Sequence, residues 1–159
     1  MLRPISLVLT LLTGFSGLVY EVAWQKYLAT LLGSHSEATA AVLAIFLGGM
    51  ALGFELFGRV TQRLSARASG AGEVPALLRT YGVVEVSIGI WALLFPWLFS
   101  AAQRISFLVP PGHEALSFAF DVLLCALLLG PPSVLMGGTI PLLTQALSRT
   151  VAESTRVHA

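Results

Sequence analysis

Four long apolar segments constrain the fold of this chain more than any other feature of its sequence. They cover roughly residues 4–32, 38–58, 76–99 and 115–147. A membrane hydrocarbon core about 30 Å thick requires roughly 20 helical residues, so each segment is long enough to cross it. The sequence therefore predicts an all-α membrane protein with four transmembrane helices within residues 1–150, followed by a short polar tail at residues 151–159.

Charged residues are too few for a soluble domain. They make up 11% of the 159 residues, against about 25% in a typical soluble protein, and 56% of the residues are hydrophobic. The net charge of +1 and the lack of a basic cluster with interleaved aromatics argue against a nucleic-acid partner. Cys125 is the only cysteine, so no disulfide can form within the chain. We therefore expect the lipid bilayer to be the principal surroundings of this chain.

Basic residues are distributed unevenly between the two ends of the four segments. With four crossings, both termini and the loop after the second segment share one side, and the other side holds only Lys26 and Arg104. The shared side holds Arg3, Arg59, Arg63, Arg67, Arg79, Arg149 and Arg156. Because basic residues collect on the cytoplasmic side, both termini are predicted to face the cytoplasm. A cleaved signal peptide is the alternative for the first segment, but no Ala-x-Ala site follows its apolar core.

Each apolar segment carries one acidic residue. These are Glu21, Glu55, Glu85 and Asp121. Ionisable groups inside a membrane are costly and usually face the interior of the helix bundle or water, so each is a candidate functional residue. A rise of about 1.5 Å per residue places Glu21 and Asp121 at one outer level, and Glu55 and Glu85 at an inner level.

Small residues share a helical face with three of these acids. The rows at helical spacing are Thr13, Gly17, Glu21 and Gln25; Ala41, Ala44, Gly48, Ala51 and Glu55; and Tyr81, Glu85, Gly89, Ala92 and Pro96. Small residues let helices approach closely in lipid, and Gly49 and Gly53 form a further pair of this kind. We therefore expect the acids to point into helix–helix interfaces and not toward lipid.

An ion pair within one helix is a structural alternative to a functional role, and it fits Glu55 better than Glu21. Glu55 lies four residues before Arg59, which is the spacing of an ion pair on one helix face. Glu21 is harder to explain in this way, because its nearest cation, Lys26, is five residues away and poorly placed for such a pair. Glu21 is therefore the stronger candidate for a functional role.

Glu85 and Asp121 also have structural alternatives. Glu85 could hydrogen-bond to Tyr81 or to a neighbouring helix, and Asp121 could extend toward the outer surface. His35 and His113 fall in the predicted outer loops, but they lack the tight ligand spacing of a metal site. We therefore expect no metal site, no other cofactor and no catalytic residue in this chain.

The stretch GPPSVLMGGTIP, residues 130–141, places three prolines and three glycines inside the fourth apolar segment. Proline lacks a backbone N–H and clashes with the preceding turn, so a kink or break is predicted at Gly130–Pro132, with further loosening at Gly137 and Gly138. Residues 115–147 would extend about 50 Å as a straight helix, which exceeds the membrane core. Broken helices line substrate sites in transporters, whereas a plain proline kink is the structural alternative.

Four blocks of the sequence, in this order, resemble a known family. The blocks are SGLVYEVAWQKYLATLLG (16–33), VLAIFLGGMALGFELFGRVTQRL (42–64), YGVVEVSIGI (81–90) and GPPSVLMGGTIPLLTQAL (130–147). They are similar to the multi-pass membrane region that precedes the aminopropyltransferase domain in bacterial membrane-bound spermidine synthase-like proteins. That region is in turn similar to the first half of a major facilitator transporter, with Arg59 and Arg63 in the place of its cytoplasmic loop motif.

The resemblance implies a location in the bacterial inner membrane and a role for some of the acids. Glu21 and Glu85 match acidic positions of the family pattern. Glu55 stands where an uncharged residue is expected, and Asp121 lies outside the matching blocks. The chain contains no glycine-rich nucleoside loop and no paired carboxylates outside its apolar segments. We therefore expect that it cannot carry out aminopropyl transfer alone and is not an enzyme.

Two hypotheses for the function follow. In the first, the chain binds or helps to pass a small cation such as a polyamine, as one half paired with a copy of itself or with another membrane subunit. The predicted site residues are Glu21, Glu85, Asp121, Gly130, Pro131, Gly137 and Gly138. In the second, it is a non-catalytic structural subunit or a membrane anchor for a larger complex or a soluble aminopropyltransferase, and the acids join the helices. Four helices are few for alternating access, which normally needs two repeats.

Overall fold

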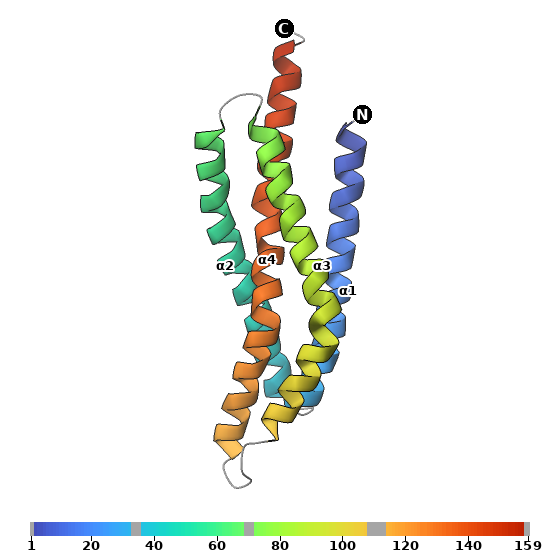
Figure 1. Ribbon diagram of the computed structural model, residues 1–159, viewed down its shortest axis with the longest axis vertical. Coiled ribbons are helices and arrows are strands. Elements are labelled where there is room, and N and C mark those ends of the chain that lie inside the picture. Colours follow the sequence, from blue (N-terminus) through green and yellow to red (C-terminus); the bar gives the residue numbers. More distant parts are fainter. Residues whose placement is uncertain (1, 33–35, 69–71, 108–113, 158–159) are drawn as a thin grey trace.

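The protein is a bundle of four long helices, seen in a computed structural model that describes residues 2–32, 36–68, 72–107 and 114–157 (Figure 1). The helices are α1 (Leu2–Leu32), α2 (Ser36–Arg67), α3 (Glu73–Ser106) and α4 (Glu114–Val157). No strand occurs within these ranges. The side chains of residues 2–10, 13, 18, 36–38, 114 and 151–157 lie outside the described part. The described part also excludes His35 and His113 of the predicted outer loops, and the side chains of Arg3 and Arg156 from the predicted cytoplasmic side.

Three of the helices are long and apolar enough to cross a membrane. The candidate spans are Thr39–Arg67, Glu73–Ser106 and Ala115–Thr150, with mean hydropathies of 2.0, 1.8 and 1.9. They correspond to the second, third and fourth apolar segments of the sequence, and the second and third run about two turns beyond their predicted C-terminal ends. The all-helical fold is therefore confirmed, and three of the four predicted segments form helices long and apolar enough to cross a membrane. A crossing by α1 stays a prediction, since the described side chains cover only part of that helix.

Helix α4 lies between α2 and α3 and makes the most extensive contacts in the bundle (Figure 1). Its contact with α2 is the largest and its contact with α3 is second, whereas α1 touches each of the other helices far less. The start of α1, the end of α2, the start of α3 and the end of α4 lie at the same end of the bundle (Figure 1). We call this end the terminal end and the other one the loop end.

The buried core is divided between these two ends. Toward the loop end, all four helices contribute to one cluster, which includes Trp24 of α1, Phe46 of α2, Phe95 of α3 and Leu129 of α4. Toward the terminal end, the buried members of the second cluster come from α3 and α4 alone. Helix α1 is therefore held mainly by its C-terminal half. Its N-terminal half packs less closely, and Phe15 is 66% exposed.

Helix α4 continues without interruption through Pro131, Pro132 and Pro141, so of the predicted kink or break at Gly130–Pro132 the break is wrong, and the kink stays a prediction. A partner on α3 replaces one of the backbone donors that these prolines remove. Pro132 cannot donate to the carbonyl of Leu128 one turn earlier, and the indole Nε1 of Trp91 donates to that oxygen instead, at 3.0 Å. The freed carbonyl is thus paired with protein and is not left for a ligand.

The glycines of α2 and α4 bring these two helices into backbone contact. A Cβ atom at Gly53 would overlap the carbonyl oxygen of Val134, and one at Gly137 would overlap that of Met50. A Cβ at Gly49 would lie only 2.6 Å from the Cβ of Ser133. Such close approach is how helices associate in lipid, where burial of apolar surface gives no drive of its own. Helices α2 and α4 are therefore the most closely packed pair of the bundle.

Candidate ligand-binding cavity

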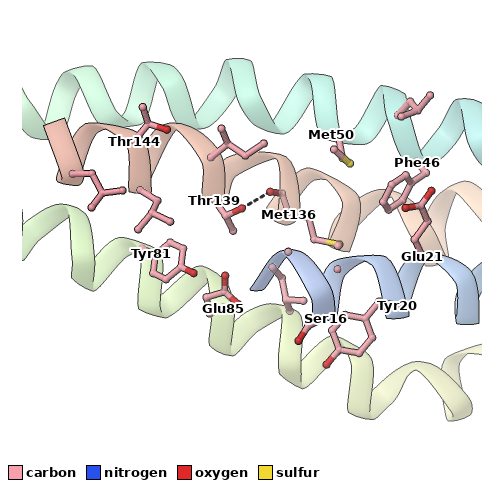
Figure 2. Close-up of a pocket in the computed structure, with 17 residues that line it drawn as sticks. Ser16, Tyr20, Glu21, Phe46, Met50, Tyr81, Glu85, Met136, Thr139 and Thr144 are labelled. Atoms are coloured by element: carbon pink, nitrogen blue, oxygen red, sulfur yellow. Dashed lines mark hydrogen bonds between the residues drawn. The ribbon is translucent and has the colours of Figure 1, made fainter. Parts of the chain in front are cut away.

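A cavity of about 440 Å³ opens between the helices on the terminal side of the main core (Figure 2). It forms because α1 diverges from the α2–α4 pair there, and because Gly14 and Gly17 place no side chain on that face of α1. All four helices line it. The lining residues are Gly14, Ser16, Gly17, Tyr20, Glu21, Phe46, Leu47, Met50, Tyr81, Glu85, Ile88, Met136, Thr139, Ile140, Leu143, Thr144 and Leu147.

Two carboxylates reach this cavity from different helices. Glu21 comes from α1 and Glu85 from α3, and both residues are half-buried. One oxygen of Glu85, Oε1, is shielded from solvent and has no hydrogen-bond partner among the described residues. Buried polar atoms are almost always paired, so an unpaired carboxylate oxygen at a cavity wall identifies a position that a donor from outside the chain can fill.

The walls around the carboxylates are mainly apolar and aromatic. The ring of Tyr20 stacks on that of Trp24 at 5.3 Å, and the ring of Trp24 stacks in turn on Phe95 at the same separation. The terminal methyl group of Met136 faces α1, where a Cβ at Gly17 would lie only 2.9 Å from it. These contacts close the cavity toward the loop end, where the four-helix core begins.

Glu21 sits at this closed end of the cavity. Together with Phe46 it also lines a much smaller pocket that continues toward the loop end, beside Gln25 and Leu129. In Figure 2 the Glu21 carboxylate lies near Phe46, whereas Glu85 lies further along the helix axes beside Tyr81. The two carboxylates are therefore displaced from one another along the cavity.

Asp121 lies outside the cavity. It is buried, and the hydroxyl of Ser106 donates a hydrogen bond of 2.6 Å to its Oδ1. Glu21 shares its small pocket with Leu129, and Asp121 is eight residues further toward the loop end of α4, which corresponds to about 12 Å. The prediction that Glu21 and Asp121 occupy one level is therefore wrong. The alternative of an acid that extends toward the outer surface stays a prediction, since Asp121 pairs with the last residue of α3.

The four predicted site residues of the proline–glycine stretch are not among those that line the cavity. Gly137 and Gly138 contact α2, where Met50 and Phe57 would clash with any side chain at those positions. Gly130 and Pro131 lie on α4 at the level of the loop-end core. The α4 residues that do line the cavity fall between Met136 and Leu147, toward the C-terminal end of the helix.

The carboxylate of Glu55 forms an ion pair with Arg59, with an Nη2 to Oε1 distance of 2.9 Å. Both side chains are more than 60% exposed, and Ala44, Gly48 and Ala51 of the same row are exposed as well. The expectation that this row points into a helix–helix interface is therefore wrong within the described chain. Gly49 and Gly53, on the adjacent face, make the contact with α4.

The sequence did not lead us to predict that serine and threonine residues line the cavity. Ser16, Thr139 and Thr144 all line it, and Thr139 Oγ1 donates to the carbonyl of Met136 at 2.7 Å. The signal that could have found them is helical spacing. Met136, Ile140 and Thr144 form a row at i, i+4, of the same kind that identified the acids on the other helices.

No group of three or more His, Cys, Asp or Glu side chains that could bind a metal occurs within the described ranges. The chain matches no protein-family model, no curated protein and no solved structure. The chemistry of the cavity itself is then the basis for assigning a ligand. Carboxylates only accept hydrogen bonds when ionised, so Glu21 and Glu85 suit a cationic donor, and the apolar walls suit a ligand with carbon beside its charge.

Proposed function

We propose that this protein is a membrane-embedded module that binds, or helps to pass, a small organic cation such as a polyamine. The observation that carries the proposal is the pair of carboxylates, Glu21 and Glu85, on the walls of one apolar cavity. The unpaired Oε1 of Glu85 supports it further, because it has room for a donor that the described chain does not supply.

The energetic argument favours an ammonium ligand. A carboxylate held away from water loses hydration, and an opposite charge a few ångströms away recovers much of that loss because the surroundings have a low dielectric constant. Hydrogen bonds between ionised partners are also about twice as strong as neutral ones. An organic ammonium with an alkyl body gains from both the carboxylates and the apolar walls.

The resemblance to bacterial spermidine synthase-like membrane regions supports a polyamine as the cation and the bacterial inner membrane as the location. Glu21 and Glu85, the two acids that match the family pattern, are also the two that line the cavity. In this proposal the chain binds without catalysing a reaction and works with a second membrane subunit or a further copy of itself. Both termini face the cytoplasm, as the arginine distribution predicts.

The test is a binding titration with spermidine on purified protein in lipid nanodiscs. We expect spermidine to raise the thermal unfolding midpoint of the wild type, because a ligand that binds only the native state stabilises it. Glu21→Gln and Glu85→Gln should each abolish that rise, whereas Glu55→Gln should retain it. An unchanged midpoint for the wild type over a wide range of spermidine concentrations would refute the proposal.

A structural role within a larger membrane complex is the second candidate. It is favoured by the exposed row of small residues on α2, namely Ala44, Gly48 and Ala51, because small residues commonly mark helix contacts in lipid. Gly48→Leu should then reduce copurification of the partner subunit in mild detergent, while leaving spermidine binding intact. Unchanged copurification would argue against a helix contact at this face.

A further inference from the structure

The separation of the two carboxylates carries information about the shape of the ligand. The rings of Trp24 and Tyr27 on α1 contact those of Phe95 and Phe99 on α3, which runs in the same direction, and these contacts place Trp24 at about the level of Phe95. In that register Glu21 is level with residue 92 of α3, seven residues beyond Glu85. At about 1.5 Å of rise per residue, the two carboxylates are displaced by about 10 Å along the cavity. One ammonium group cannot contact both.

The wall between the carboxylates is mainly apolar and contains no further charged group among the described residues, although Ser16 and Tyr20 also line it (Figure 2). By the same register Gly17 of α1 and Ile88 of α3 lie at its midpoint, and the methyl group of Met136 reaches the same place from α4. A charge placed here would lose hydration without gaining a partner of opposite charge, whereas methylene groups are favoured.

From this geometry we propose that the cavity selects an elongated organic dication, with one ammonium at Glu85, the other at Glu21 and an uncharged alkyl chain between them. The inference deepens the proposed function and rests on it. Once the first ammonium is bound, the second binds within the same complex, so the ligand gains from both carboxylates without a second loss of translational freedom. A monoamine of equal chain length gains from only one.

The experiment compares octylamine with 1,8-diaminooctane, which share a carbon chain and differ by one ammonium group. Binding is measured by calorimetry on the wild-type protein in nanodiscs, with empty nanodiscs as the control for partition into lipid. We expect the diamine to bind about tenfold more tightly than octylamine, or better.

Substitutions test the carboxylate at each end of the cavity separately. Glu21→Gln and Glu85→Gln should each reduce the affinity for 1,8-diaminooctane to about that of octylamine, and Glu55→Gln should leave it unchanged. Gly17→Leu, which retains both acids, should fill the midpoint and weaken the diamine more than octylamine. Equal affinities of the two amines for the wild type would overturn the dication inference and leave the proposed function standing. Binding of neither amine would overturn both.

Discussion

At the scale of single residues, helical spacing and chemistry predicted part of the site. Glu21 and Glu85 were identified because acids inside apolar segments must find polar partners, and both line the cavity. Asp121 met the same criterion, yet it pairs with Ser106. Depth counted from the start of an apolar segment could not separate these cases, because it fixes neither the register between helices nor the identity of a partner.

Trp91 shows how one side chain allows prolines inside a continuous helix. Replacing it by phenylalanine keeps an aromatic ring but leaves the Leu128 carbonyl without its donor. We expect Trp91→Phe to lower the free energy of unfolding by about 1 kcal/mol, within the range for interhelical hydrogen bonds in membranes. Reversible unfolding in mixed micelles measures this value. Trp97→Phe is the matched control, because Trp97 is 70% exposed, and it should change stability by less than about 0.5 kcal/mol. Equal effects of the two substitutions would contradict the role assigned to Trp91.

At the scale of helices, the sequence located the apolar segments and the small residues but not the continuity of α4. Proline and glycine mark a helix break when only the local chain is considered. Here the glycines allow backbone contact with α2, and an indole on α3 replaces the missing donor. Both reasons lie in other helices, which local spacing does not describe. The observed helix is 44 residues long and passes through the whole stretch.

The α2–α4 contact predicts a sharp difference between two glycines on α2. Gly53→Ala places a methyl group against the Val134 carbonyl and should destabilise the protein by about 1–3 kcal/mol, the usual range for overpacking. Gly48→Ala meets no atom within 4 Å and should be neutral or stabilise by up to about 1 kcal/mol, since alanine favours helix. Unfolding curves of both variants in the same micelles provide the comparison. A Gly53→Ala variant as stable as Gly48→Ala would show that the backbones do not approach so closely.

At the scale of the whole molecule, α1 is fastened at the loop end and diverges toward the terminal end, and this divergence creates the cavity. The sequence could indicate an all-helical membrane bundle because apolar length and low charge leave few other folds. It could not indicate the uneven packing of α1, which depends on how well each helix face fits its neighbours.

The orientation of the bundle in the membrane is a separate prediction from the arginine distribution. Single cysteines introduced at Ser34 and Gly112, in a Cys125→Ala background, should react with a membrane-impermeant maleimide added to intact cells. A cysteine at Ser154 should react only after lysis, because the terminal end is predicted to face the cytoplasm. The reverse pattern would place the opening of the cavity on the outer side.

The central claim is that Glu21 and Glu85 share one cavity that a cation fills, and carbodiimide protection tests it most directly. Purified protein in nanodiscs is treated with dicyclohexylcarbodiimide, an apolar reagent for carboxyl groups, at increasing spermidine concentrations. Peptide mass spectrometry then measures the modified fraction of each acid. We predict that spermidine protects Glu21 and Glu85 with the same concentration dependence and leaves Asp121, which lies outside the cavity, unchanged. Modification of Glu21 and Glu85 that is indifferent to spermidine, or protection of Asp121 to the same degree, would contradict the account.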